Sequence, residues 1–397
     1  MQLKELFHRR YLFYGLSIVL GRGLELAVMF FAAKYLAKAV YGELEYYKKV
    51  LEVGGVFLSF GFPALIITYT RSRKSKVYLF VYAVLFVTAL VLGLIPFLAW
   101  ARSVQLAPGL WFYAVLFSGG ILPAYLLIRY GSDKASLYKI LFSLIYWGAV
   151  YFYLTHSARP QRAFLRVTAV LVLPGAAFIA YEWLRSHVRW NEFKRYAAHF
   201  HKLLKGSLAL VLSNFANMMF LYTDIFIIRF LSSRPHLDIA HYSFSLNMAN
   251  ILMLIPFTLV QVDMNRFKEN KTYYRILSKK ILWLTLLGML LLIPAYKILT
   301  GVWIVKYRDT FGLFLLILLA KFFQAQGVMY GTGILVLKRY EYNMKVNIGM
   351  IGLNVALNLL LFPFLGLYGV ALASMISLLT RYLILRRYFL LRQTSDR

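Results

Sequence analysis

Four ionisable side chains interrupt long apolar stretches of this 397-residue sequence: Arg22, Glu25, Asp224 and Lys321. An ionisable group near the centre of a membrane helix costs about 2.5–3.5 kcal/mol on insertion scales, so it usually faces a partner or a water-filled cavity. Arg22 and Lys321 lie near the middle of their apolar stretches. Both are cations, which suits the binding of phosphate oxygens. The alternative is that each cation pairs with a nearby carboxylate as a structural tie.

The two carboxylates predict a different chemistry. A carboxylate in a low-dielectric site readily changes its protonation state, so Glu25 and Asp224 are candidates for binding a coupling proton or sodium ion. Glu25 follows Arg22 by three residues, and an intrahelical salt bridge is the alternative. For Asp224 the alternative partners are Arg229 and a lipid headgroup. We expect no other cofactor, no catalytic group and no metal site.

Amide side chains within the apolar stretches form a third group. Those that we consider for sugar contact are Asn214, Asn217, Asn250, Asn354 and Gln324. An amide offers both hydrogen-bond donors and acceptors, which suits sugar hydroxyls. Because amides more often join one membrane helix to another, we expect only a minority of them to touch a sugar.

The composition indicates that lipid surrounds these groups. Hydrophobic residues make up 61% of the chain and charged residues 15%, against about 45–50% and about 25% in soluble domains. The net charge of +30 gathers in short clusters between apolar stretches, where anionic headgroups account for it better than nucleic acid does. The absence of cysteine excludes disulfides and Cys-ligated zinc or iron–sulfur clusters.

About twelve stretches approach the roughly 20 residues that a helix needs to cross a bilayer. They are 11–33, 50–70, 77–100, 109–130, 137–155, 163–184, 205–231, 240–263, 276–299, 310–336, 342–364 and 367–389. Lys and Arg are concentrated in alternate connections, beginning with the N-terminal one, which predicts that both termini are cytoplasmic. The first stretch is expected to be a membrane helix and not a cleaved signal peptide.

The connection 185–204 separates two halves of the chain. Its apolar residues recur at three- or four-residue steps with basic residues between them, which is typical of an amphipathic helix on a membrane surface. The sequence therefore predicts an all-α polytopic membrane protein with an N-terminal six-helix bundle at 1–184, a cytoplasmic linker at 185–204 and a C-terminal six-helix bundle at 205–397.

Short motifs along the chain resemble one transporter family. They are Gly21-Arg22-Gly23 with Tyr41-Gly42-Glu43-Leu44, Phe60-Gly61-Phe62-Pro63, Tyr222-Thr223-Asp224, Asn354 to Asn358, and Gly366 to Ala373. In this order they are similar to Wzx-type polysaccharide flippases, of the superfamily that includes the MATE drug exporters and the lipid II flippases. The sequence departs from the family pattern at Ala240, where glycine is common, and in being short.

The resemblance implies both a fold and a cargo. It implies two six-helix bundles around a central cavity that opens to one side of the inner (plasma) membrane at a time. It also implies that the cargo is an undecaprenyl-diphosphate-linked oligosaccharide, moved from the cytoplasmic to the outer leaflet for O-antigen or other polysaccharide biosynthesis, alongside other assembly proteins. Arg22 and Lys321 would then bind the diphosphate.

Two other functions stay open on the residues alone. A membrane glycan polymerase or glycosyltransferase would need acid or base groups at the outer face. The outer connections are short, and their acids are Glu43, Glu45, Asp238 and Asp309. A small-molecule exporter of the same superfamily would carry cations in an acidic cavity, whereas the cations Arg22 and Lys321 predict a basic one.

Overall fold

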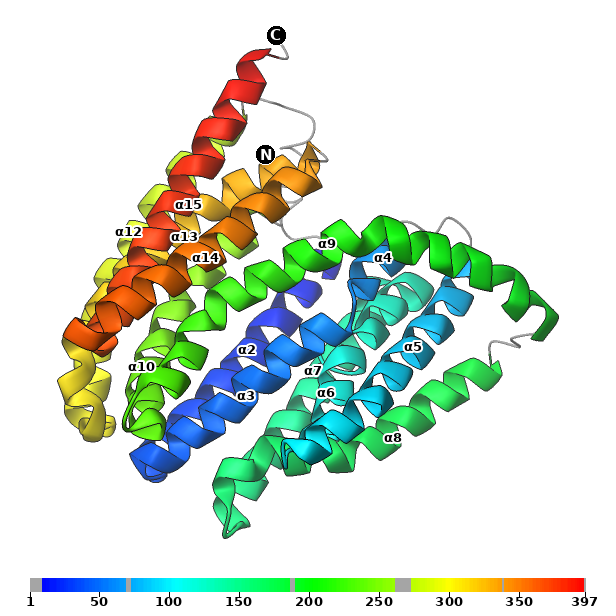
Figure 1. The fold of residues 1–397 in the computed structure, drawn as a ribbon, viewed down its shortest axis with the longest axis horizontal. Helices are drawn as coiled ribbons and strands as arrows, with labels where there is room; N and C mark the ends of the chain where they lie inside the picture. Colours follow the sequence, from blue (N-terminus) through cyan, green and yellow to red (C-terminus); the bar gives the residue numbers. More distant parts are fainter. Residues whose placement is uncertain (1–8, 69–72, 186–189, 261–272, 338, 396–397) are drawn as a thin grey trace. The chain divides into compact units, whose positions relative to one another are not determined.

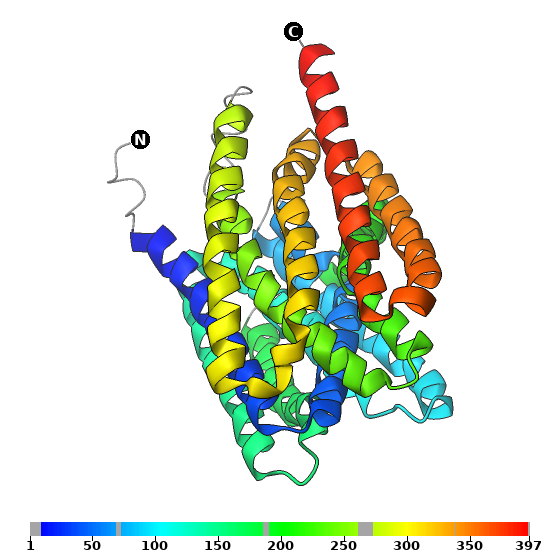
Figure 2. The same ribbon diagram turned by 90° about the vertical axis from the view of Figure 1, so that its left-hand side faces the viewer.

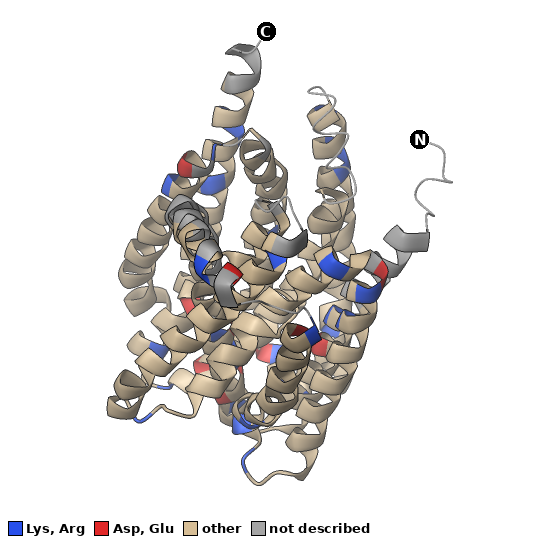
Figure 3. Cartoon of the chain, turned by 90° about the vertical axis from the view of Figure 1, so that its right-hand side faces the viewer, with Lys and Arg blue, Asp and Glu red and all other residues tan. Residues whose placement is uncertain are grey.

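The computed structural model describes residues 9–68, 73–185, 190–260, 273–337 and 339–395, and these ranges contain helices and no strand (Figure 1). A helix satisfies its own backbone hydrogen bonds, as a lipid environment requires. Among the described residues, 8 helical segments are long and apolar enough to cross a membrane. Long stretches of the ribbon carry neither sign of charge (Figure 3). The prediction of an all-α polytopic membrane protein is confirmed.

Several predicted stretches differ from the helices in their boundaries. The helix α3 (Lys38–Leu58) begins well before residue 50, and the following α4 (Phe62–Thr68) is separate from it. Between them, Phe60 and Gly61 have φ angles of 49° and 69°, which end the helical path. The stretch 109–130 runs across the end of α6 (Leu106–Val115) and the start of α7 (Ile121–His156).

The predicted surface linker and the predicted stretch 205–231 belong to a single element. Residues Trp190–Leu231 form one continuous helix, α9. In its first part, Glu192 accepts a hydrogen bond of 2.6 Å from the Tyr78 hydroxyl, and Phe200 stacks on Phe62 and Tyr82. The first turns of α9 are therefore packed against α4 and α5 (Arg73–Trp100).

The chain folds into two compact units. The first, unit 1, takes in the chain as far as Ala32 together with Tyr47–Phe215, and unit 2 holds Ala33–Tyr46 and Ala216–Arg397. The segment Ala33–Tyr46, called here the hairpin tip, joins the end of α2 (Arg9–Tyr35) to the first turns of α3. The boundaries at 184 and 204 stay a prediction about how the chain divides into domains.

Unit 1 has an aromatic core. Helix α6 packs against α5 and α8 (Ala163–Arg185), and α7 packs against α4, α5 and α8. Within this core, Phe112 stacks on Tyr146, and the hydroxyls of Tyr113 and Tyr146 are 2.8 Å apart. Each buried hydroxyl thereby finds a partner, so that the aromatic rings fill the interior without leaving a polar group unsatisfied.

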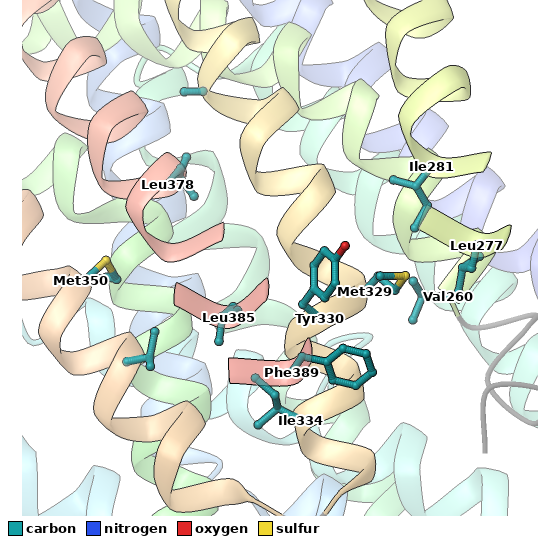
Figure 4. Packing of buried hydrophobic residues seen from close by; sticks show 12 residues of the cluster. Val260, Leu277, Ile281, Met329, Tyr330, Ile334, Met350, Leu378, Leu385 and Phe389 are labelled. Atoms are coloured by element: carbon teal, nitrogen blue, oxygen red, sulfur yellow. The ribbon is translucent and has the colours of Figure 1, made fainter. Parts of the chain in front are cut away.

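Unit 2 is built around α13 (Phe311–Val336), which packs against α10 (Pro235–Asn250), α12 (Tyr273–Ile298) and α15 (Leu367–Ser395). The last two helices, α14 (Tyr340–Leu365) and α15, form a hairpin that turns at Gly366 (Figure 2). Figure 4 shows Leu385 and Phe389 of α15 packed beside Tyr330 and Ile334 of α13, with Leu277 and Ile281 contributed by α12. The described part of the unit also contains short helical turns: η2 (Ile251–Met253), the π-helical turn η3 (Leu299–Trp303) and η4 (Val305–Thr310).

Close approach of α3 and α6 in unit 1 depends on Gly55. A Cβ atom placed there would lie 2.5 Å from the Tyr113 Cβ atom and 3.0 Å from its carbonyl carbon. Backbone cannot move aside as the end of a flexible side chain can. Small residues allow membrane helices to approach closely in this way.

We predict that Gly55→Ala destabilises the protein by about 1–3 kcal/mol, the usual cost of overpacking. The matched control is Gly93→Ala on α5, where a new Cβ would meet nothing within 4 Å. That variant should be neutral or stabilised by up to about 1 kcal/mol, because alanine favours the helix. Thermal unfolding in detergent measures both, and equal stability of the two variants would contradict the proposed contact.

Candidate functional site

A cluster of charged residues lies within unit 1, on the adjacent helices α2 and α3. Arg22 Nη1 lies 2.8 Å from Glu25 Oε2, and Lys48 Nζ lies 2.5 Å from Glu25 Oε1. Lys48 also approaches Glu52 at 3.9 Å, and Lys49 donates to Glu52 at 3.0 Å. We call these five residues the basic cluster, because three cations face two carboxylates.

The members of the basic cluster differ greatly in exposure. The Lys48 and Lys49 side chains are 1% and 3% exposed, whereas the Arg22 side chain is 60% exposed. Lys48 Nζ also lies 5.7 Å from the centre of the Trp147 ring, which adds a cation–π contact. The buried lysines thus hold the carboxylates, and Arg22 presents the accessible part of the cluster.

The predicted position of Lys48 and Lys49 is wrong. A helix that began at residue 50 would leave both lysines, and Glu45, in an outer connection. Because α3 begins at Lys38, all three lie within the helix and are buried. Because residues 38–52 carry several charges, a search for apolar stretches does not detect that the helix begins at Lys38.

A second polar group surrounds Asp224 in unit 2, where α9, α10, α14 and α15 come together. The buried Asp224 carboxylate accepts hydrogen bonds from Ser374 Oγ at 2.5 Å, from Asn358 Nδ2 at 3.2 Å and from the Tyr242 hydroxyl. Asn354 in turn donates to Ser374 Oγ at 3.1 Å. We call this group the Asp224 network.

Lys321 on α13 lines the same cavity as Asp224. Its Nζ donates to Gln324 Oε1 at 3.0 Å, and both side chains are buried. Lys321 and Asp224 line one small cavity of about 10 Å³, together with Tyr242 and Ser374. A space of this size is at the limit for a single water molecule. The predicted phosphate-binding cation and the predicted ion-binding carboxylate therefore meet at one point.

The predicted sugar-binding amides fall in different places. Asn354 and Gln324 are engaged in the contacts described above, and Asn250 lies half-buried at the end of α10. The side chains of Asn214 and Asn217 lie outside the described part of the structure. The amide of Asn354 thus joins α14 to α15, the commoner use of an amide in a membrane.

Three members of the Asp224 network, Tyr242, Asn358 and Ser374, are absent from the binding and coupling residues that the sequence predicts. For Asn358 there was a usable signal, because Asn354 and Asn358 are four residues apart and so share one face of a helix. Tyr242 and Ser374 carry no such signal. Tyrosine and serine are common in membrane helices, and only the packing of α10 and α15 places these two beside a carboxylate.

We predict that Lys48→Met destabilises the protein by about 3 kcal/mol, the lower end for a broken buried ion pair, because Arg22 still contacts Glu25. Adding Glu25→Gln to Lys48→Met should recover most of the loss, since no carboxylate is then left without its buried partner. Thermal unfolding of the single and double variants measures both effects. A double variant no more stable than Lys48→Met would show that the pair has no such coupling.

Comparison with known proteins identifies the fold. No family model and no curated protein matches the chain. Among solved structures, the inward-facing conformation of a MATE family multidrug resistance transporter of the MOP superfamily is similar with a TM-score of 0.68 and 13% identity, over 95% of this chain and 94% of that one.

Two further structures widen the comparison. The lipid II flippase MurJ in an inward closed conformation has a TM-score of 0.62 and 14% identity, over 94% of this chain and 86% of its own. A MOP superfamily transporter from Pyrococcus furiosus, described as having a binding pocket of reverse polarity, has a TM-score of 0.59 and 13% identity, over 97% and 96% of the two chains. At these identities the likeness concerns the fold, and the chain has the fold of the MATE-type transporters.

Proposed function

We propose that this protein is a transporter that moves undecaprenyl-diphosphate-linked oligosaccharide from the cytoplasmic to the outer leaflet of the plasma membrane by alternating access. The fold supports transport, because it is shared with MATE transporters and with a protein described as a lipid II flippase. The observation that carries the choice of an anionic cargo is the basic cluster, in which three cations face two carboxylates on α2 and α3.

Arg22 is the group in the basic cluster that is placed to contact cargo. One guanidinium nitrogen binds Glu25, and the side chain is 60% exposed. A guanidinium presents five N–H donors in a planar fork, so it can hold a carboxylate and a phosphate oxygen together. Lys48 and Lys49 add positive potential from buried positions, and this potential acts strongly where little water screens it.

The Asp224 network supports a separate role in ion coupling. Its hydrogen bonds come from hydroxyl and amide groups, which are neutral. A buried carboxylate with oxygen-bearing neighbours suits a proton or a hard monovalent cation. Glu25, the other predicted coupling group, is engaged by two cations. We therefore propose Asp224 as the coupling residue and Glu25 as the residue that positions Arg22.

Lys321 is proposed to sense the state of Asp224. Because both residues line one cavity, a charge on the carboxylate attracts the ammonium, and a bound proton or cation removes that attraction. The predicted diphosphate contact of Lys321 would require α13 to expose a side chain that is 5% exposed. Transport by alternating access provides such an exposure if the Asp224 cavity opens during the cycle.

We predict that Arg22→Ala lowers the initial rate of cargo flipping at least about tenfold, the effect of losing about 1.4 kcal/mol of binding. Arg22→Lys should retain part of the rate because it keeps the charge. Flipping of a fluorescent polyprenyl-diphosphate oligosaccharide in proteoliposomes measures this, with exposed Arg159→Ala as the matched control. Arg22→Ala and Lys321→Ala proteins that both flip the cargo at the original rate would exclude these residues from the cargo site.

For the coupling role, we predict that Asp224→Asn makes flipping insensitive to an imposed sodium or proton gradient, because the amide cannot exchange a charge. Exposed Asp133→Asn on α7 is the control and should keep the response. The rate is measured in proteoliposomes with each gradient imposed separately. An Asp224→Asn protein that still responds to the same gradient would place the coupling ion elsewhere.

A further inference from the structure

A groove of about 500 Å³ lies within unit 1 between α5 and α8. Helix α6 packs against both of these helices, and its first turns line the groove (Figure 1). On α5 the lining residues recur at intervals of seven, as at Val81, Thr88 and Ile95, and on α8 they extend from Val172 to Trp183. Residues three, four and seven apart share one face of a helix. Each of the two helices therefore presents one of its faces to the groove.

Small side chains leave this space open. Ala176 and Ala180 on α8 and Ala107 on α6 each contribute a single methyl group to the lining. Protein interiors are close-packed and contain few voids larger than a water molecule. The volume of the groove falls instead within the range of about 300–1,000 Å³ that is usual for ligand sites. The groove is therefore large enough to hold a molecule.

The groove offers almost no polar group to an occupant. Its described lining residues carry no charge, and Thr88 has the one hydroxyl among them. That hydroxyl donates to the carbonyl oxygen of Val84 at 2.8 Å and accepts a hydrogen bond of 2.9 Å from Trp111 Nε1. The polar atoms of these two side chains are therefore satisfied by each other and by the backbone. Because a polar occupant would leave its own donors and acceptors unsatisfied, the groove suits hydrocarbon.

The groove opens toward the lipid-facing surface of the protein. Its walls belong to Ser75–Trp100 and Pro160–Arg185, two of the segments that are long and apolar enough to cross a membrane. Leu92 lines the groove and is also exposed. From Val81 to Ile95 the lining follows about 21 Å of helix, which exceeds the roughly 15 Å of hydrocarbon in one leaflet. A lipid chain can therefore lie in the groove along its whole length.

One end of the groove is close to basic residues. Trp183 lines this end, and the exposed Arg185 follows it on α8. The start of α5, which carries Lys76, lies at the same end, because Tyr78 donates a hydrogen bond to Glu192 just beyond α8. Tryptophan is common at the membrane–water interface, and lysine and arginine near the ends of membrane helices attract anionic headgroups. This end of the groove therefore suits an anionic headgroup.

Two carboxylates also lie at this end of the helices. Glu182 is buried and lies 3.3 Å from Arg129 Nη1, which balances its charge. Glu192 accepts its hydrogen bond from a neutral tyrosine at 2.6 Å. When Lys76 and Arg185 are counted with Arg129, the cations of this group outnumber its carboxylates. The carboxylates therefore do not cancel the attraction for an anionic headgroup.

We propose that the groove binds one acyl chain of an anionic phospholipid of the bilayer, with the headgroup phosphate at the end that carries Lys76 and Arg185. The chain fills the space between α5 and α8 and so contributes to the packing of unit 1. The basic cluster lies on α2 and α3, so this lipid site is separate from the cargo contact proposed for Arg22. It does not depend on which cargo the protein carries.

Tryptophan fluorescence tests the proposal directly, because bromine on a lipid chain quenches an indole only at close contact. Trp111 lines the groove and is buried, so a chain must enter the groove to reach it. Trp147 is the matched control, because it is also buried in unit 1 and does not line the groove. Two variants of the full chain each retain one of these residues, with every other one of the 7 tryptophans replaced by phenylalanine.

In proteoliposomes, we expect brominated phosphatidylglycerol to quench most of the Trp111 fluorescence and little of the Trp147 fluorescence. Brominated phosphatidylcholine, which has no net charge, should quench Trp111 less, because its headgroup is attracted less strongly by the cations. Combining Lys76→Gln with Arg185→Gln should remove this difference between the two lipids.

Filling the groove provides a second arm of the test. Ala176→Phe places a ring in the groove and should protect Trp111 from quenching. Val170→Phe, at an exposed position of α8 outside the groove lining, is the matched control and should leave the quenching unchanged. If Ala176→Phe fails to fold, Ala180→Phe fills the same space.

Equal quenching of Trp111 and Trp147 would overturn the proposal, as would equal quenching of Trp111 by the two brominated lipids. Relief of the Trp111 quenching by a small amount of unbrominated polyprenyl diphosphate would assign the groove to a polyprenyl chain and would also overturn it. If the proteins with one tryptophan fail to fold, Trp111→Phe and Trp147→Phe are compared in the otherwise unmodified protein. A quenched fraction that falls in Trp111→Phe alone supports the proposal, and any other result contradicts it.

Discussion

A charge buried away from water must be paired or hydrogen-bonded, because no solvent is available to stabilise it. This constraint accounts for the arrangement of the polar residues in both units. Unit 1 solves it with ion pairs, in which Glu25 contacts Arg22 and Lys48 on neighbouring helices. Replacing these pairs by apolar groups would often be neutral for stability. Their presence is therefore better explained by the positive potential that they maintain than by a contribution to folding.

Unit 2 solves the same problem with neutral groups. Asp224 and Glu45 are both buried, and the hydrogen bonds that they accept come from tyrosine, serine and asparagine side chains. These contacts are hydrogen bonds and not ion pairs for both carboxylates. The two units thus differ in their chemistry. The cations of unit 1 suit the anionic cargo that we propose, and the Asp224 carboxylate of unit 2 suits the coupling ion that we propose.

Hydropathy predicted the helical architecture because most of the helices contain long apolar stretches, which a lipid-facing surface requires. It failed where a helix carries charges. Lys48, Lys49 and Glu45 occupy buried positions on α3, but the polar turns around them resemble a connection when read along the sequence alone. Neighbouring helices supply partners that allow those turns to be buried: Glu25 contacts Lys48, and Asn247 donates a hydrogen bond to Glu45.

The candidate sites show the same limit. Glu25 and Arg22 could be paired from their spacing, and Asp224 could be selected as an isolated acid in an apolar stretch. Asp224 and Lys321 are almost a hundred residues apart, and their meeting at one cavity depends on how α9 and α13 pack in unit 2. The φ angles of Phe60 and Gly61, which separate α3 from α4, likewise had no clear signal beyond one glycine.

We propose that the protein carries an anionic, diphosphate-linked lipid. The most direct measurement compares the flipping rate of one oligosaccharide attached to polyprenyl diphosphate with that of the same oligosaccharide attached to an uncharged polyprenyl ether, in proteoliposomes of the unmodified protein. We expect rapid flipping of the diphosphate-linked lipid and a rate no higher than that of protein-free vesicles for the uncharged one. Equal rates for the two lipids would contradict the claim, as would export of a cationic dye with no flipping of either lipid.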